Sequence, residues 1–239
     1  MGRWTWAVLG LVACGGGSSD DDDDGGGDAS VALVFEVEGE ASGASVDVLG
    51  AWTRNGASYS SFSNDDRWSS AIVLLEYTGA DGACLDAAAD ALRDDDKPHE
   101  TNWVRVLGPT GSTAAFTPCL VTGDTFAVAF DIYETREEVA RVAITLLPVD
   151  REPELGAGEL EGQLFEEDEG STYAGTIPFL DDDGRTVDVL AIATRGGTPV
   201  DWAIDEDYVS PGGEVEFSVD LDVAFERVDD VMAFFRIGV

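Results

Sequence analysis

Apolar and polar residues alternate over much of the chain from residue 31 onward. A period of two is typical of β-strands that bury one face and expose the other. The longest row alternates with acidic or small residues and consists of Val215, Phe217, Val219, Leu221, Val223 and Phe225. A second row consists of Phe126, Val128, Phe130 and Ile132, and further strands are predicted at residues 46–52, 71–77, 142–147 and 187–194.

Turn signals separate these segments. They are Asn55-Gly56, Gly123-Asp124, Asp183-Gly184, Gly196-Gly197 and Pro211-Gly212-Gly213. Glycine and asparagine tolerate the left-handed backbone that tight hairpins require. Short strands with this punctuation predict an all-β fold, an antiparallel β-sandwich with immunoglobulin-like architecture.

One segment departs from the alternation. Residues 83–93 are rich in alanine, and Leu85, Ala88, Ala89 and Leu92 stand at helical spacing. This spacing predicts one short helix, which would carry Cys84.

Two windows of the chain are similar to each other. The residues Val46-Asp47-Val48-Leu49 and Thr53-Arg54-x-Gly56 recur as Val187-Asp188-Val189-Leu190 and Thr194-Arg195-x-Gly197, at a constant offset of 187 − 46 = 141 positions. The recurrence favours two related β-units, at residues 30–150 and 158–239, with a polar stretch at 150–162 between them. One continuous sandwich is the alternative.

The N-terminus has the layout of an export signal. Arg3 is followed by an apolar run at residues 4–13, which is shorter than the about 20 residues of a membrane span. The run ends in Leu11-Val12-Ala13-Cys14, which resembles the lipobox of bacterial lipoproteins. The resemblance implies removal of residues 1–13 and a lipid on the Cys14 sulfur. Gly15, in place of an aspartate, points by the same resemblance to the outer membrane.

Residues 14–29 continue from the lipidated cysteine as a linker. The sequence from Gly15 reads GGGSSDDDDDGGGDA and offers no side chain to a hydrophobic core. Glycines make such a segment flexible, and repulsion between aspartates extends it. We expect it to hold the folded part away from a membrane.

The chain is strongly acidic, with 49 acidic against 13 basic residues and a net charge of −36. It has no basic patch to neutralise phosphates, so nucleic acid is excluded as a partner. Repulsion also opposes contact with an anionic bilayer surface. Cations and basic proteins stay possible partners, although solubility in a salty habitat would explain the charge without any.

Three cysteines are present. If Cys14 carries lipid, Cys84 and Cys119 form an even pair in an oxidising compartment, which predicts a disulfide. Closing that loop would stabilise the fold by about 4 kcal/mol in the loop-entropy treatment. The alternatives are two buried free thiols, or two thiols of which one is exposed at the surface. A metal site at these cysteines is disfavoured, because the chain has a single histidine and no C-x-x-C motif.

The sequence gives little support for catalysis. His99, the sole histidine, stands in an acidic stretch that we expect to be a solvated loop, and no G-x-S-x-G motif accompanies it. A carboxylate-based hydrolase is the least favoured alternative, since so acidic a chain brings carboxylates together in any fold. No cofactor is expected.

Two sets of residues are candidates for ligand contacts. Carboxylates that could bind Ca²⁺ are Asp181, Asp182, Asp183, Asp205 and Asp207, although Asp183-Gly184 is better explained as a hairpin turn. Indoles that could stack on sugars are Trp52, Trp68, Trp103 and Trp202, although aromatic strand residues more commonly pack in a core.

We therefore expect a lipid-anchored protein of the cell envelope that acts as a non-catalytic binding or structural module. Its partners would be the membrane, through the lipid on Cys14, and a protein or polysaccharide of the envelope. A carbohydrate-binding or calcium-stabilised adhesion domain is the alternative within the same location.

Overall fold

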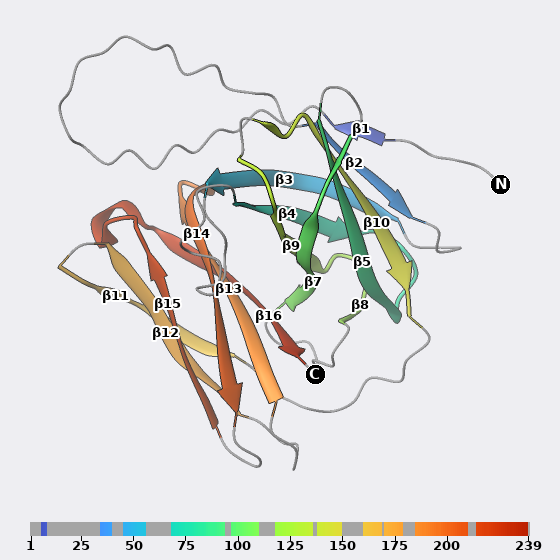
Figure 1. The fold of residues 1–239 in the computed structure, drawn as a ribbon. Helices are drawn as coiled ribbons and strands as arrows, with labels where there is room; N and C mark the ends of the chain where they lie inside the picture. Colours follow the sequence, from blue (N-terminus) through green and yellow to red (C-terminus); the bar gives the residue numbers. More distant parts are fainter. Residues whose placement is uncertain are drawn as a thin grey trace, which may run out of the picture.

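The computed structural model describes residues 6–8, 34–39, 45–55, 68–93, 97–109, 118–135, 138–149, 160–168, 170–178, 185–209 and 214–238 (Figure 1). The described residues form β-strands with connecting turns and one short 3-10 helix, η2 (Phe225–Arg227). They include no helix that is long and apolar enough to cross a membrane. The predicted all-β, sandwich-like fold is confirmed.

The strands form three sheets. A six-stranded sheet has the order β1 (Trp6–Val8), β2 (Val34–Gly39), β10 (Arg141–Pro148), β5 (Ala83–Leu92) and β6 (Pro98–His99), with β8 (Cys119–Leu120) also paired to β5. A seven-stranded sheet has the order β14 (Thr198–Val209), β13 (Arg185–Arg195), β16 (Asp230–Gly238), β7 (Thr101–Pro109), β9 (Thr125–Ile132), β4 (Ser69–Tyr77) and β3 (Val46–Asn55). A three-stranded sheet consists of β11 (Glu161–Glu166), β12 (Ser171–Pro178) and β15 (Glu214–Leu221). The pairings are antiparallel except for β2 with β10, which is parallel.

The seven-stranded sheet joins the two predicted units. Strands β3, β4, β7 and β9 come from the first unit, and β13, β14 and β16 come from the second. The junction is a short ladder in which Phe234 pairs with Pro109 and Phe235 with Gly108. The domain boundaries stay a prediction, but this one sheet runs through both halves of the chain.

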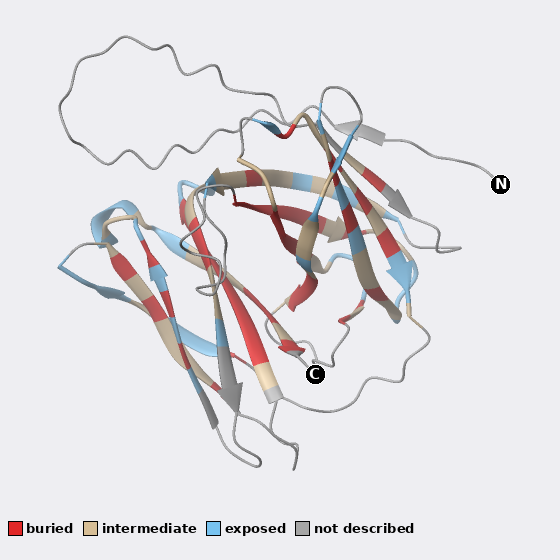
Figure 2. Ribbon diagram, viewed as in Figure 1, coloured by how far each residue is buried: buried red, intermediate tan, exposed pale blue. Residues whose placement is uncertain are grey.

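Both faces of this sheet are buried. One face packs against the six-stranded sheet at its β4 and β9 end, and against the three-stranded sheet at its β13 and β16 end. The opposite face, here called the inner face, buries a third core lined by Trp52, Ile72, Leu74, Leu107, Ala127, Ala129, Leu190, Ile192, Trp202 and Phe234. Figure 2 shows buried residues along these strands, whereas β11 at the margin is mostly exposed.

The seven-stranded sheet is strongly curled. Its two edge strands, β3 and β14, lie at opposite ends of the strand order. Even so, the Nη1 atom of Arg54 on β3 donates a 2.8 Å hydrogen bond to the carbonyl oxygen of Trp202 on β14. The Arg54 guanidinium also lies 4.5 Å from the centre of the Trp202 ring. The edges can meet in this way because the sheet bends around its inner face.

The predicted helix at residues 83–93 is wrong, because this segment is strand β5. Leu85, Ala89 and Ala91 are buried at a spacing of two or four, which is the strand period. Alanine fits both a helix and a closely packed strand, so the apparent helical spacing carried little information. Pairing with β10 over eight residues and with β8 decides in favour of the strand.

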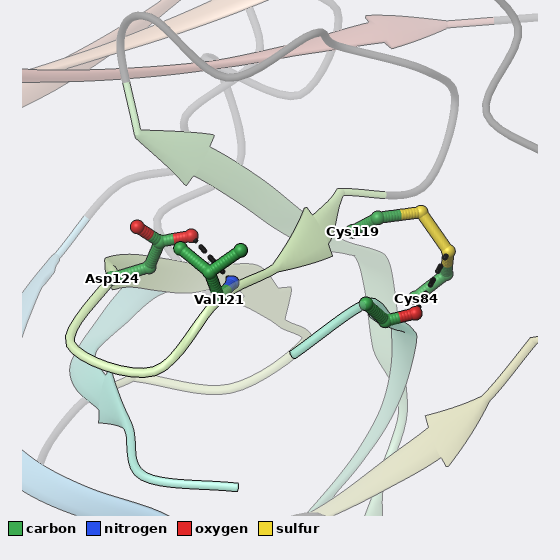
Figure 3. The surroundings of a disulfide bond; sticks show 5 residues. Cys84, Cys119, Val121 and Asp124 are labelled. Atoms are coloured by element: carbon green, nitrogen blue, oxygen red, sulfur yellow. Dashed lines mark hydrogen bonds between the residues drawn. A yellow bond between two sulfur atoms is a disulfide. The ribbon is translucent and has the colours of Figure 1, made fainter. Parts of the chain in front are cut away.

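A disulfide joins Cys84 on β5 to Cys119 on β8, as predicted (Figure 3). The two cysteines are direct partners in the β5–β8 ladder. The turn that follows β8 is held locally, because the Val121 amide donates a 2.8 Å hydrogen bond to Asp124. The crosslink therefore fixes β8 against β5, and the turn after β8 leads into β9.

The internal similarity corresponds to β3 and β13. Val46 and Val48 pack toward the core of their own half, as Val187 and Val189 do in theirs. A β-bulge between Val48 and Gly50 then shifts the register of β3, whereas β13 continues without a shift until Ala193. The bulge turns Trp52 and Arg54 to the inner face. Equivalent sequence positions thus acquire different surroundings.

The last alternating row ends earlier than predicted. Strand β15 stops at Leu221, and Phe225 lies in η2 with 39% of its surface exposed. The turn predicted at Gly196-Gly197 joins β13 to β14, and both glycines have a positive φ.

Gly50 allows the inner core to form. A Cβ atom at this position would collide with the indole of Trp52. We predict that Gly50→Ala lowers the free energy of unfolding by roughly 1–3 kcal/mol, as overpacking does in other cores. Urea denaturation measures this. In a protein that also carries Trp52→Phe, Gly50→Ala should lower the free energy of unfolding by less than it does in wild type. An equal loss in both proteins would contradict the proposed collision.

Candidate functional site: a buried ion cluster beside an exposed tryptophan

Arg105 is the centre of a charged cluster on the inner face. It lies on β7 and is 6% exposed. Its Nε atom is 2.5 Å from Oδ2 of Asp188 on β13, and its Nη2 atom is 3.2 Å from Oε2 of Glu206 on β14. These ion pairs cross the curled sheet and connect the first half of the chain to the second.

Asp188 is almost completely buried, at 2% exposure. Burial raises the pKa of this carboxyl to about 6, and the nearby Arg105 and Arg236 guanidinium groups only partly oppose the shift. Oδ1 of Asp188 and Nε of Arg236 are buried and have no hydrogen-bond partner among the described residues. The group as a whole holds two arginines and two carboxylates, so its formal charge balances when all four are ionised.

A second polar group lies nearer the edge of β3. The hydroxyl of Ser70 donates a 2.6 Å hydrogen bond to Asp131, which is fully buried. Burial lowers the pKa of Arg54, while Asp201, Asp222 and Asp131 act in the opposite direction. These polar residues flank the apolar inner core.

Trp103 stands beside the ion cluster and is exposed. It lies in a β-bulge of β7, where the register with β9 shifts between Asn102 and Arg105. The guanidinium of Arg105 is 4.8 Å from the centre of its ring, and Nη1 of Arg105 donates a 3.4 Å hydrogen bond to its carbonyl oxygen. Trp103 as a whole residue is 43% exposed.

The backbone of Trp103 is unusual. Its φ of 57° makes it the one non-glycine residue with a positive φ in the described part of the chain. A left-handed backbone costs an ordinary L-residue roughly 1–2 kcal/mol. Such strain collects at sites where the direction of a side chain matters.

The other three candidate tryptophans are buried. Trp52 and Trp202 belong to the inner core, at 5% exposure each. Trp68 is 6% exposed, and its ring packs edge-on against Tyr133 at a centroid distance of 4.9 Å. Of these four tryptophans, Trp103 alone is exposed.

The candidate calcium ligands are not gathered into one described site. Asp181, Asp182 and Asp183 lie outside the described residues, and so does the side chain of Asp207. Asp205 accepts a 3.5 Å hydrogen bond from the Ser218 amide. No group of three or more histidine, cysteine or acidic side chains suited to a metal ion occurs among the residues that the structure describes.

His99 does not lie in a solvated loop, so that expectation is wrong. It forms β6, which pairs with β5, and its side chain is only 4% exposed. Its Nδ1 atom is 3.7 Å from Glu134, and its Nε2 atom is 3.4 Å from the carbonyl oxygen of Glu138. The carboxyl of Glu138 has a raised pKa, mainly because it shares a hydrogen bond with Glu134.

Sequence reasoning missed the ion cluster. Asp188 alternates with Val187 and Val189, as a solvent-facing residue would, and Glu206 lies in an acidic run. A faint signal was Arg105, because it is a rare cation inside the apolar stretch Val104–Leu107. The alternation of polar and apolar residues separates the two faces of a strand, but it does not show whether the polar face is also buried.

No protein-family model matches the chain, and no curated protein is significantly similar to it in sequence.

The raised pKa of Asp188 predicts an acid-stabilised fold. The folded carboxyl binds its proton at about pH 6 and the unfolded one near pH 4, so this group adds stability as the pH falls through 6. When the pH is lowered from 7.5 to 4.5, the free energy of unfolding of wild type should rise relative to that of Asp188→Asn by roughly 2 kcal/mol. Urea denaturation at each pH measures this difference. Asp47→Asn, an exposed change of equal charge on β3, controls for general repulsion. Parallel pH profiles of wild type and Asp188→Asn would contradict the assignment.

Proposed function

We propose that this chain is exported, lipidated on Cys14 and held at a membrane of the cell envelope, where it serves as a non-catalytic binding or structural module. The observation that carries the proposal is the sequence Leu11-Val12-Ala13-Cys14, preceded by a short apolar run and followed by a core-free linker. The sequence around Gly15 favours the outer membrane.

The disulfide supports the export part of the proposal. Disulfides form and persist outside the cytosol, where thiols are not kept reduced. Cys84 and Cys119 are joined, and in the proposed mature protein Cys14 is modified by lipid. Each cysteine of the chain therefore has a use that fits an oxidising compartment.

Cleavage before Cys14 would also change one sheet edge. Strand β1 pairs with β2 and lies in the segment that processing would remove. Strand β2 would then form the edge of its sheet. Its sequence carries glutamates at positions 36 and 38, and charges on an edge strand oppose aggregation through strand pairing.

A binding role is favoured over a purely structural one by Trp103. Its exposed indole and left-handed backbone are features of a contact residue rather than of a core residue. The same observation favours the carbohydrate-binding alternative, since flat aromatic rings are stacking surfaces.

The anchor is tested by replacing Cys14. Cys14→Ser should abolish labelling by radioactive palmitate and move the protein from the membrane fraction to the soluble one, because the acyl chains that provide stable anchoring are absent. The double variant Cys84→Ser/Cys119→Ser is the matched control and should keep both label and membrane location. An unlabelled wild type, or a Cys14→Ser protein that stays with the membrane, would refute the proposal.

A further inference from the structure

We propose that Trp103 is the stacking platform for a sugar ring, and that the ligand is a neutral polysaccharide of the envelope. The inference rests on the proposed binding function and names its ligand class and contact residue. It is argued from the backbone of Trp103, from its exposure and from the charges next to it.

The bulge in β7 directs Trp103 outward. On either side of it, Asn102 pairs with Asp131 and Arg105 pairs with Ala129, so β7 holds one more residue than β9 across this interval. A bulge of this kind re-aims a side chain and is frequent next to functional sites. Here it gives a large aromatic residue a left-handed backbone that glycine or asparagine would adopt more readily.

Hydrophobic burial alone does not account for this arrangement. A tryptophan residue that stays 43% exposed gains only part of the hydrophobic free energy of burial. Phe165 on β11 is a useful comparison, because it is 46% exposed on an unbulged strand. At Trp103 the chain combines backbone strain with exposure, which points to a contact made by the ring itself.

The surroundings of the ring select a neutral ligand. Arg105 and Arg236 are balanced by Asp188 and Glu206, so the cluster beneath the ring presents no net charge. A chain of net charge −36 repels polyanions such as nucleic acid. The guanidinium of Arg105 already lies against the Trp103 ring, so a cation would meet a like charge there.

A sugar ring matches these conditions. Its C–H groups form a flat, weakly positive surface that suits the negative face of an indole. Its hydroxyl groups need polar partners placed beside that face. The side chain of Glu206 is 32% exposed and is held by Arg105, the residue whose guanidinium contacts the ring, so its carboxylate can serve as an acceptor.

The test uses the full chain purified in detergent, with binding to the neutral glycans chitin and cellulose measured by sedimentation. Soluble chitohexaose and cellohexaose are then titrated by calorimetry. Wild type should bind at least one of these glycans, and both Trp103→Gly and Trp103→Asn should lose affinity at least tenfold. Trp103→Phe should retain part of it, and Phe165→Ala should bind as wild type does.

Thermal melting separates a contact role from a structural one. Trp103→Gly relieves the backbone strain but loses the contact with Arg105, so it should stay folded and melt close to the wild-type temperature. Cys14→Ser should bind the glycans normally, so a failed anchor and a failed binding site give different results. The proposal is overturned if wild type binds none of the glycans, if Trp103→Gly and Trp103→Asn bind undiminished, or if polyarginine is the ligand that depends on Trp103.

Discussion

The pairing of β16 with β7 is the contact on which the architecture depends. It is a ladder of two residue pairs, yet it turns strands from both halves of the chain into one seven-stranded sheet. That sheet supplies a wall to each of the two outer cores and all of the strands around the inner one. The inner face can bury ten apolar side chains because the sheet curls until β3 and β14 meet through Arg54 and Trp202.

Burial of the inner face has an electrostatic cost. Arg105 and Asp188 are removed from water, and such pairs offset their lost hydration only when geometry and partners are favourable. The raised pKa of Asp188 indicates that the compensation is incomplete. The same arginine contacts the ring of the strained Trp103 and donates a hydrogen bond to its carbonyl oxygen, so Arg105 connects the buried cluster to the exposed residue. Arg105, a buried polar residue of the inner face, thus helps to hold Trp103, the surface residue that we propose binds the ligand.

Much of the fold could be predicted from the sequence, since alternation located β3, β4, β9, β10, β13 and β15 and the cysteine count located the disulfide. The segment at 83–93 failed because alanine is small enough for either structure, and tertiary pairing decided between them. The candidate site was largely beyond sequence reasoning. Four tryptophans looked equivalent, and the bulge that exposes Trp103 depends on register with β9. The charged residues of the inner face looked solvent-facing, because alternation does not show that both faces of a strand are buried. The inner face becomes buried only when β7 pairs with β16, which is distant in sequence.

The β7–β16 ladder also constrains the order of folding. It joins residues 109 and 234, which are 234 − 109 = 125 positions apart, and β16 follows the other described strands in sequence. The inner core therefore cannot close until residues 234 and 235 have been synthesised and can reach β7. Until then Ile72, Leu74 and Leu107 would face water on a half-built sheet. Contacts of such long sequence separation form slowly and leave strand edges open to aggregation, so a chain emerging through a membrane would benefit from a holding chaperone.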